Sequence, residues 1–585
     1  MVGLSAPLSH CYPNVKRITK ILRDLFPDVW IVVGGHLAGS ANVVLHKTET
    51  DICVVGDGEI PFVKLLDYFK LHPTRRQLDH TGLHQIKGLA FIDKNHKLKV
   101  TGNAEQLSAS EMTYPDYNQL KAGLQKYGGD DKLIHEFFDP IGEDDFLKEI
   151  VRDNKDSYVL KFYEKNQSKT IGKLGTSRGC VARCTFCQRS QKGYRPYMIS
   201  DLENYIINSK EKYNIGMFGF NDENFGSNRK QSYEIARLMK KHDVYWMAGG
   251  VRCTSVTYED LKFYKDHNLA FIKFGIETGS QRILDIMEKK FTTDDVYNAV
   301  LNCKKLGIST STDTLMIGMP GETKETVIQS AQFVASLRYI SGSDWNIGQP
   351  FLAMAIPGTP LYEYCQQIGA IGKTLEDEED YLIRVSEHKN THILNYVNKT
   401  NANIKEVHYW LYLYNYAGKK AYLDLVIKNN KSIRNKLSQI YEQYIKGSFN
   451  GMISEYNQRK KRYNNKKLFR KVKWLTLLSI NFLLTVSVPL LPKAVFFSIV
   501  RVYANLRFYS LEKNNKVKKG KQKYNLFADQ SVDSANNFRI TENKIAKVNR
   551  PIERSLRTFV MENRKKIKLA ITEEEKGLQI LAQGQ

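Results

Sequence analysis

The chain is poor in cysteine, and nothing at its start resembles a leader sequence. Eight cysteines stand among 585 residues, and five of them are scattered singly. This sparse and uneven spacing excludes the dense disulfide framework of a small secreted protein and favours a reducing cytosol. No signal peptide is expected, because Met1 runs directly into the strand-like segment 2–5. We therefore expect a cytoplasmic protein.

An excess of charge is also absent from most of the chain. Residues 1–400 carry 50 basic and 49 acidic side chains, whereas residues 401–585 carry 37 basic and 13 acidic ones. The net charge of +25 is therefore a property of the C-terminal part. This basic part is expected to be attracted to an anionic surface, either a membrane or a nucleic acid. A hydrophobic content of 42% excludes a wholly disordered chain, and the length suits two to four domains.

The first 75 residues alternate between strand and helix patterns. Apolar runs at 29–33 and 52–55 are separated by helical stretches, which indicates a parallel sheet covered on both faces. Gly34 and Gly35 follow the first of these runs. Glycines at the carboxyl end of a parallel strand allow a ligand to approach the backbone. The alternative is that the pair only turns a strand into a loop.

Residues 76–170 are expected to form a connector that contains a small hairpin, with strands at 88–91 and 97–101. His80 and His84 are one helical turn apart and could bind a metal, but two histidines without a third ligand are more often surface residues. Between residues 173 and 371 the pattern becomes repeated strand and helix, which is typical of a parallel barrel or open sheet.

Three cysteines lie within eight residues. Cys180, Cys184 and Cys187 are separated by three and two residues, a spacing that lets three thiolates bind one iron–sulfur cubane from a single loop. Three ligands leave one of four irons open. A structural zinc site would need a second pair of ligands, and a disulfide would leave one cysteine over, so both alternatives are weak.

This spacing, with Phe186 immediately before the last cysteine, resembles the signature of the radical S-adenosylmethionine (SAM) enzymes. The resemblance implies a [4Fe-4S] cluster on Cys180, Cys184 and Cys187. In that family the amino and carboxylate groups of SAM chelate the open iron, and electron transfer releases a 5′-deoxyadenosyl radical. An electron donor such as flavodoxin or ferredoxin is then expected as a partner.

Later segments resemble the remaining strands of the family's partial barrel, in the same order. These segments are 218–225, 245–253, 271–280 and 315–323, followed by a proline-glycine turn at 356–362. A carboxylate suits the ribose hydroxyls of SAM and a basic side chain suits its carboxylate. The resemblance implies SAM contacts from Asp222, Arg252, Glu277 and Gly318. A helix-initiating surface glutamate is the alternative for Glu277, and a structural salt bridge is the alternative for Arg252.

The first 75 residues resemble the second half of the cobalamin-binding domain that precedes many radical SAM enzymes. Ser5 would lie in the family's serine-containing loop, and Gly34 and Gly35 would form its glycine pair. Both elements receive the lower nucleotide of cobalamin in that family. The earlier strands, with their Asp-x-His-x-x-Gly motif, have no counterpart here.

The C-terminal part carries three further features. The acidic run 376–380 is expected to be a solvated loop, and a tyrosine-rich helix is expected around 407–427. Residues 474–492 contain no charge, but their polar residues and Pro489 argue against an independent membrane span. An interfacial or re-entrant segment on anionic lipid is preferred, with a buried helical hairpin as the alternative. Residues 513–523 are expected to be a flexible arm.

Together these patterns predict an α/β protein. A partial, TIM-like (β/α)6 radical SAM barrel follows an incomplete Rossmann-like parallel-sheet domain and precedes a mainly helical, basic extension. We expect a partial cobalamin-binding-like domain at 1–75, a connector at 76–170 and the radical SAM core at 171–375. A helical extension at 376–470, an apolar and membrane-associated segment at 471–510, and a basic flexible tail at 511–585 are expected to follow.

The resemblance implies an enzyme that functionalises an unactivated C–H bond. It would act by methylation if cobalamin binds, and by rearrangement, cyclisation or another radical step if it does not. The basic, apolar tail favours a small-molecule or lipid-like substrate, with the protein peripheral at the inner face of the membrane, and argues less for nucleic acid. Two alternatives stay open: a radical methylthiotransferase relative that modifies RNA, and a truncated remnant without turnover.

Overall fold

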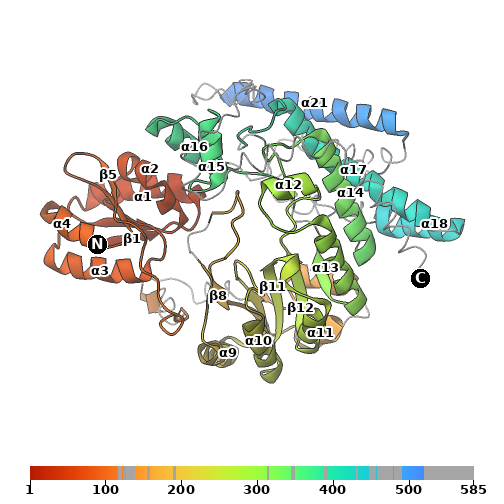
Figure 1. The fold of residues 1–585 in the computed structure, drawn as a ribbon, viewed down its shortest axis with the longest axis horizontal. Helices are drawn as coiled ribbons and strands as arrows, with labels where there is room; N and C mark the ends of the chain where they lie inside the picture. The colour runs from red at the N-terminus through yellow and green to blue at the C-terminus, as the bar shows by residue number, and fades with distance from the viewer. Residues whose placement is uncertain are drawn as a thin grey trace. The chain divides into compact units, whose positions relative to one another are not determined.

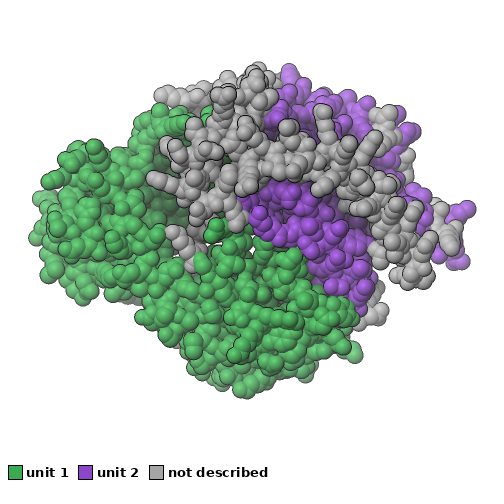
Figure 2. All heavy atoms as spheres, in the orientation of Figure 1, with its two compact units in different colours: residues 1–275, 354–397 green, residues 276–353, 398–585 purple. Residues whose placement is uncertain are grey.

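The computed structural model describes residues 1–115, 139–153, 158–188, 193–312, 315–343, 350–387, 396–429, 432–446 and 491–518, with isolated residues between these ranges. The chain divides into two compact units (Figure 2). The first contains residues 1–275 and 354–397, and the second contains residues 276–353 and 398–585. The six expected divisions of the chain stay predictions.

The first unit begins with a five-stranded sheet in the order β1-β2-β3-β4-β5. Its first three strands are parallel, with Val2 opposite Ile31 and Ser5 opposite Gly34. The next two form an antiparallel hairpin, so both the parallel sheet and the hairpin predicted here are confirmed. The strands are β1 (Val2–Ser5), β2 (Ile31–Gly34), β3 (Ile52–Val54), β4 (Leu89–Ile92) and β5 (Leu98–Val100).

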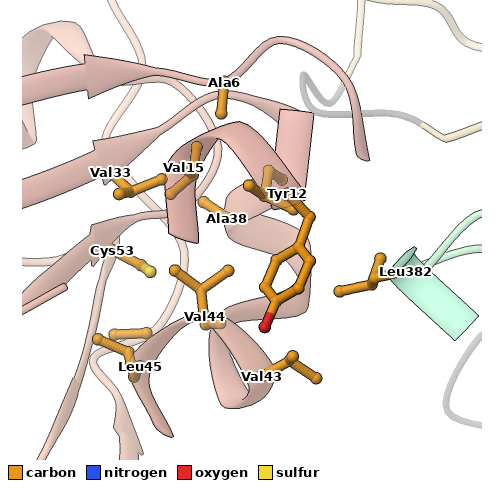
Figure 3. Close-up of a cluster of buried hydrophobic side chains, with 13 residues drawn as sticks. Ala6, Tyr12, Val15, Val33, Ala38, Val43, Val44, Leu45, Cys53 and Leu382 are labelled. Atoms are coloured by element: carbon orange, nitrogen blue, oxygen red, sulfur yellow. The ribbon is translucent and has the colours of Figure 1, made fainter. Parts of the chain in front are cut away.

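Short helices connect these strands (Figure 1). Helix α1 begins at Tyr12–Pro13, where the fixed backbone of proline suits a first turn. One core of the sheet gathers Tyr12, Val33, Val44 and Cys53 (Figure 3). The helical elements are η1 (Ser9–Cys11), α1 (Tyr12–Leu25), η2 (His36–Ser40), α2 (Ala41–Lys47), α3 (Glu59–Leu71), η3 (Arg75–Gln77) and α4 (His80–Gln85).

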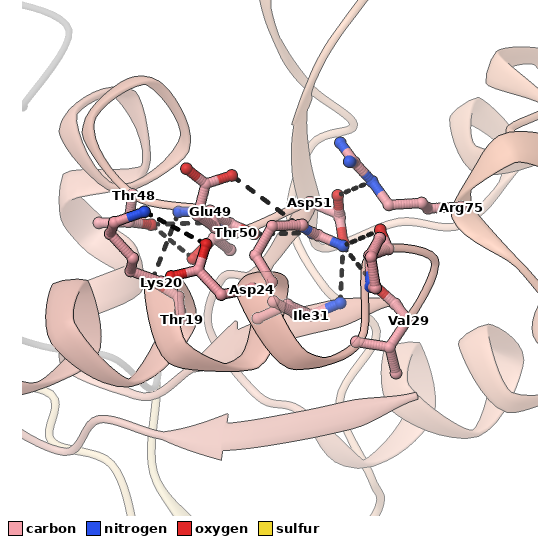
Figure 4. A network of polar contacts seen from close by, with 12 residues as sticks. Thr19, Lys20, Asp24, Val29, Ile31, Thr48, Glu49, Thr50, Asp51 and Arg75 are labelled. Carbon is pink, nitrogen blue, oxygen red and sulfur yellow. Dashed lines mark hydrogen bonds and ion pairs between the residues drawn. The ribbon is translucent and has the colours of Figure 1, made fainter.

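A buried carboxylate ties the strands β2 and β3 to helix α1 (Figure 4). Asp51 accepts hydrogen bonds from the Ile31 amide at 2.8 Å, from Arg23 at 2.8 Å and from Arg75 at 3.0 Å. Its side chain is 9% exposed, so these charge-assisted bonds are shielded from water. This network stabilises the sheet at the end opposite to the glycine pair.

A second sheet in the first unit contains the parallel strands β7, β10, β11 and β12, with the short β6 antiparallel at one edge. Helices follow β10 and β11, as the strand-and-helix pattern predicts. Helices α7 and α8 contribute to the core beside β7 and β10. The elements are β6 (Asp139–Pro140), α7 (Asp145–Asp153), α8 (Tyr158–Lys165), β7 (Thr170–Leu174), β8 (Ser177–Arg178), β9 (Arg195–Pro196), α9 (Ile199–Tyr213), β10 (Ile215–Phe220), α10 (Arg229–Lys241), β11 (Tyr245–Val251), η4 (Cys253–Ser255), α11 (Tyr258–Asp266) and β12 (Leu269–Phe274).

The acidic run 376–380 is a helix, and its prediction as a solvated loop is wrong. It forms the start of α16 (Leu375–Glu387), which follows α15 (Pro360–Gln367) in the first unit. Glu379 accepts hydrogen bonds from Tyr12 and Lys16, and Leu382 packs into the core of the first sheet (Figure 3). The run is helical because one face of the helix contacts Tyr12 and Lys16 on α1 and packs on the apolar core of the first sheet.

The second unit combines short strands with long helices. Strands β14 and β15 are parallel, and α14 packs along α17, which in turn packs on α21. The tyrosine-rich helix predicted around 407–427 is confirmed as α17. The elements are α12 (Gln281–Ile286), α13 (Thr293–Leu306), β13 (Ser309–Ser311), β14 (Met316–Ile317), α14 (Lys324–Ser341), β15 (Phe351–Leu352), α17 (Ile404–Asn429), α18 (Ile433–Gln439), the π-helical η5 (Ile440–Ile445) and α21 (Lys493–Lys518).

No helix within the described ranges has both the length and the apolar character that a membrane span requires. The uncharged segment 474–492 lies outside the described residues, apart from Ser479, Val486, Leu491 and Pro492. Residues 513–518 of the arm predicted at 513–523 continue helix α21, and residues 519–523 lie outside the described residues.

Candidate active site

The three clustered cysteines lie in the loop between β8 and β9. Cys184 is buried, Cys180 is half-buried and Cys187 is exposed, and none of the three forms a disulfide. The Cys187 amide donates a hydrogen bond to the Cys184 carbonyl at 3.3 Å, which makes a tight turn of the last two cysteines. The loop therefore presents three thiols, none of them in a disulfide, from one short stretch of backbone.

The surroundings of Cys180 are partly apolar and partly charged. Burial raises the pKa of the Cys180 thiol, against a 3.4 Å hydrogen bond from the Ala182 amide to its sulfur. The neighbouring Cys184 and Glu223 raise this pKa further, and the charge of Arg252 lowers it. Arg252 follows β11 directly, so the structure brings this predicted site residue close to the cysteine loop.

These thiols fit an iron–sulfur cluster better than a single metal ion. Among the described residues, no three Cys, His, Asp or Glu side chains gather closely enough to hold one ion. A cubane needs no such gathering, because each thiolate binds a different iron. With three soft sulfur ligands and an arginine nearby, the donor set suits a cluster with one iron left for another ligand.

Asp222, two residues after β10, is buried against the start of the cysteine motif. One carboxylate oxygen accepts hydrogen bonds from the Thr176 amide at 3.1 Å, the Thr176 hydroxyl at 2.9 Å and the Ser177 hydroxyl at 2.6 Å. Burial raises the pKa of Asp222, and these hydrogen bonds oppose the shift. Gln231 on α10 also donates to the Thr176 carbonyl at 3.0 Å. Asp222 and Gln231 therefore hold the backbone from which the loop departs.

Glu277 belongs to the second unit and has an unusual backbone. Its φ is +67°, and the Thr278 amide donates to the Ile276 carbonyl at 2.9 Å across it. This is a γ-turn with a left-handed central residue, which costs free energy for a residue with a Cβ. The Glu277 carboxylate meets Lys289 at 3.2 Å. Helix α12 begins at Gln281, so Glu277 is not a surface glutamate that starts a helix.

Gly318 lies in the turn after β14, also in the second unit. Its φ is +85°, and its amide donates to the Glu322 carboxylate at 3.2 Å. The Thr326 hydroxyl donates to the same carboxylate at 2.6 Å. Burial raises the pKa of Glu322 to about 7, and these hydrogen bonds limit the shift. Glu322 thus holds the turn that contains Gly318.

The glycine pair of the first sheet divides into two roles. Gly35 has φ +87°, and a Cβ there would lie 2.5 Å from the Ala6 carbonyl oxygen. The chain itself therefore requires glycine at this position. At Gly34 a Cβ would meet only Val54, at 4.0 Å. Ser5 is exposed at the end of β1, directly opposite Gly34.

Buried polar atoms near this pair lack partners among the described residues. They are the hydroxyls of Ser9 and Ser40 and the Nδ1 atom of His36. Ser9 lies on η1, His36 and Ser40 lie on η2, and these two turns pack on each other. Unsatisfied buried groups are costly, so they fit a polar ligand at this edge of the sheet.

His80 and His84 do not form a metal site among the described residues. Both rings pack against Phe91, with centroid distances of 5.9 and 5.1 Å.

Comparison with known proteins identifies the segment that contains most of these residues. Residues 174–334 match the model of the Radical SAM superfamily. The chain contains a radical SAM domain. The matched segment includes Cys180, Cys184, Cys187, Asp222, Arg252, Glu277 and Gly318.

Curated relatives extend the similarity beyond the matched segment. An uncharacterized methyltransferase of Pyrococcus horikoshii is 24% identical over 374 residues, covering 62% of this chain and 69% of that protein. The cytidylyl-2-hydroxyethylphosphonate methyltransferase of Streptomyces wedmorensis is 21% identical over 397 residues, covering 66% and 69%. A solved structure of the cobalamin-dependent SAM radical enzyme OxsB, with aqua-cobalamin and SAM bound, aligns with a TM-score of 0.48 at 14% identity, covering 89% and 72%.

Two residues that hold the candidate site were not singled out from the sequence. They are Gln231 and Glu322, which hold the two loops described above. Glu322 had a usable signal, because it closes the Met-Pro-Gly-Glu segment. Gln231 had none, since its partner Thr176 is 55 residues away.

Proposed function

We propose that Cys180, Cys184 and Cys187 hold a [4Fe-4S] cluster and that SAM binds the iron without a thiolate. When bound, the cluster supplies the electron for reductive cleavage of SAM. The observation that carries the proposal is one loop with three cysteines that form no disulfide, with the charge of Arg252 acting on Cys180. The reaction is the functionalisation of an unactivated C–H bond.

The chain's own residues then bind and orient SAM. Arg252 would attract the SAM carboxylate, and Glu277 would offer an acceptor to the ribose hydroxyls. Gly318, which has a positive φ and no side chain, would lie near the adenine. Asp222 acts indirectly, because its carboxylate is occupied by Thr176 and Ser177.

Methylation with cobalamin is the reaction that we favour within this class. Curated relatives that align with about two thirds of this chain are named methyltransferases. The edge of the first sheet supports a cofactor there, with Ser5 exposed, Gly34 open, and the polar atoms of Ser9, His36 and Ser40 in need of partners. Cobalamin would bind at this edge through Ser5, Gly34 and the loop that Gly35 makes.

The proposed partners follow from the chemistry and the charge distribution. A one-electron donor such as flavodoxin or ferredoxin would reduce the cluster. The basic residues of 401–585 favour a small-molecule or lipid-like substrate met at an anionic membrane surface, with the enzyme on the cytoplasmic side.

A methylthiotransferase acting on RNA is the weaker candidate. It calls for a second cysteine trio to bind an auxiliary cluster. Cys53, Cys253, Cys303 and Cys365 are instead buried, and burial raises the pKa values of Cys53 and Cys303. Buried thiols with raised pKa values are poor metal ligands.

The test is anaerobic reconstitution of the full chain with iron and sulfide. Wild type should bind about four irons per chain, and with a reductant and SAM it should release 5′-deoxyadenosine. The variant with all three cysteines changed to serine should do neither, while Cys11→Ser, which alters a cysteine outside the loop, should match wild type. Retention of the cluster by the triple variant would refute the proposal. Adding cobalamin and following methyl transfer from SAM separates methylation from the corrinoid-free reactions.

A further inference from the structure

The base of the cysteine loop is a two-residue hairpin with an arginine on each strand. Ser177 pairs with Pro196 and Arg178 pairs with Arg195, antiparallel, so the loop with all three cysteines leaves and returns at these positions. Whatever fixes the two arginines also fixes both ends of the loop.

Both arginines reach the acidic turn that follows β3 in the first sheet. Arg195 donates to Asp57 at 2.9 Å, and Arg178 forms an ion pair with Glu59. Gly56, with φ +89°, makes the turn that directs these carboxylates away from the strand. The turn 57–59 therefore contacts both strands of the hairpin, although it is more than a hundred residues away along the chain.

The Asp57–Arg195 pair is shielded and supported. The Asp57 side chain is 3% exposed and that of Arg195 is 14% exposed. Gln106 also donates to Asp57 at 2.6 Å, and Arg195 donates to the Leu107 carbonyl at 3.1 Å. A buried ion pair with such additional bonds has one defined geometry and is little affected by salt.

The pair at Glu59 is more exposed but also constrained. Arg178 donates through Nε to the Tyr197 hydroxyl at 2.8 Å while it pairs with Glu59. Burial raises the pKa of Glu59, but its bond to Arg178 and the charges of both arginines lower this pKa overall. Glu59 therefore stays ionised and keeps Arg178 in place.

A second attachment lies beside the last cysteine. The Gln188 side-chain amide donates to the His36 carbonyl at 3.2 Å and to the Pro357 carbonyl at 2.9 Å. The Leu361 amide donates to the Thr185 carbonyl at 3.0 Å. The far side of the loop is thus also tied to the first sheet, at the turn after β2.

We propose that the acidic turn after β3 helps to position the iron–sulfur cluster. Asp57 and Glu59 are positioning residues that act through Arg195 and Arg178. The inference rests on the proposed function of the cysteine loop. It gives the first sheet a second role that does not require cobalamin. Residues that orient metal ligands without touching the metal commonly alter metal affinity by roughly 10- to 100-fold.

The experiment compares Asp57→Asn, Glu59→Gln and the double variant in the full chain, reconstituted anaerobically without cobalamin. Asp67→Asn is the matched control, because Asp67 is an exposed acid of the same sheet domain, on α3. The readouts are the midpoint potential of the cluster, the g-values of its reduced form with SAM, and the half-time of cluster loss to an iron chelator. We expect the double variant to lose its cluster about tenfold faster, with changed g-values, and the control to match wild type.

Arg195→Lys keeps the charge but loses the two-point geometry, and it tests the route through the arginine if Asp57→Asn fails to fold. It should give an intermediate rate of cluster loss. Combining Asp57→Asn with Arg195→Lys should add little to the Asp57→Asn effect. If wild type holds a cluster and the acidic variants match it in all three readouts, the positioning role of Asp57 and Glu59 is overturned and the proposed function is not. If wild type binds no cluster, both the proposed function and the positioning role are overturned.

Discussion

Asp222 and Glu277 each follow a strand, β10 and β12 respectively, but the two carboxylates have opposite surroundings. One oxygen of Asp222 accepts three hydrogen bonds from the chain's own donors, Thr176 and Ser177. Glu277 has an ion pair with Lys289 and a left-handed backbone. A carboxylate whose hydrogen-bond partners all belong to the chain stabilises the folded structure. One held in a strained conformation is a candidate for binding, since such strain concentrates at functional sites.

The largest effect is expected at Asp222. Asp222→Ala leaves the buried Thr176 and Ser177 donors without an acceptor, which should lower the free energy of unfolding by about 4 kcal/mol. Asp222→Asn keeps one acceptor oxygen and should cost less. Chemical denaturation of the apo protein measures both. A stable Asp222→Ala protein that has lost only SAM binding would reverse our comparison.

Glu322 extends the comparison to a buried carboxylate that accepts hydrogen bonds from Gly318 and Thr326 and has a raised pKa. Burial raises its pKa to about 7, so between about pH 4.5 and 7 the native protein keeps a proton that the unfolded chain has released. The free energy of unfolding should therefore fall as pH rises through this window, by about 3 kcal/mol.

Glu322→Gln should remove this pH dependence, while Glu325→Gln, at an exposed position on the same helix end, should retain it. Unfolding midpoints measured from pH 5 to pH 8 decide between them. Identical pH profiles for wild type and Glu322→Gln would show that this carboxyl is ordinary.

The glycine pair sharpens the same distinction in the first sheet. Gly35→Ala should cost about 2 kcal/mol, because its φ is positive and its Cβ would collide with Ala6. Gly34→Ala should leave stability nearly unchanged and weaken cobalamin binding. Thermal unfolding and cobalamin titration of both variants provide the measurement. Equal losses of stability would mean that both glycines serve only the turn.

Glu277 should give the smallest change in energy and the most specific one. Glu277→Gln keeps the turn but weakens the acceptor for the SAM ribose, which should raise the dissociation constant of SAM about tenfold. Glu325→Gln serves again as the control in the same unit. If Glu277→Gln leaves the SAM affinity unchanged, the role of this carboxylate is its ion pair with Lys289 and not SAM binding.

Local patterns in the sequence were enough for much of the fold. The apolar runs at 29–33 and 52–55 became β2 and β3, and the hairpin of β4 and β5 appeared where turn residues separate two short strands. Both are decided by neighbours along the chain. The acidic run 376–380 was mispredicted because its helix depends on Lys16 and Tyr12, more than 350 residues away.

The cysteine spacing by itself predicted the chemistry that we propose, because local sequence sets the positions of three thiols on one short loop. Only the tertiary structure decided how that loop is held and which carboxylates are occupied. Thr176 lies 46 residues from Asp222 along the chain, Asp57 lies 138 residues from Arg195, and His36 lies 152 residues from Gln188. Contacts at such separations depend on how sheets pack, and packing leaves no periodic trace in the sequence.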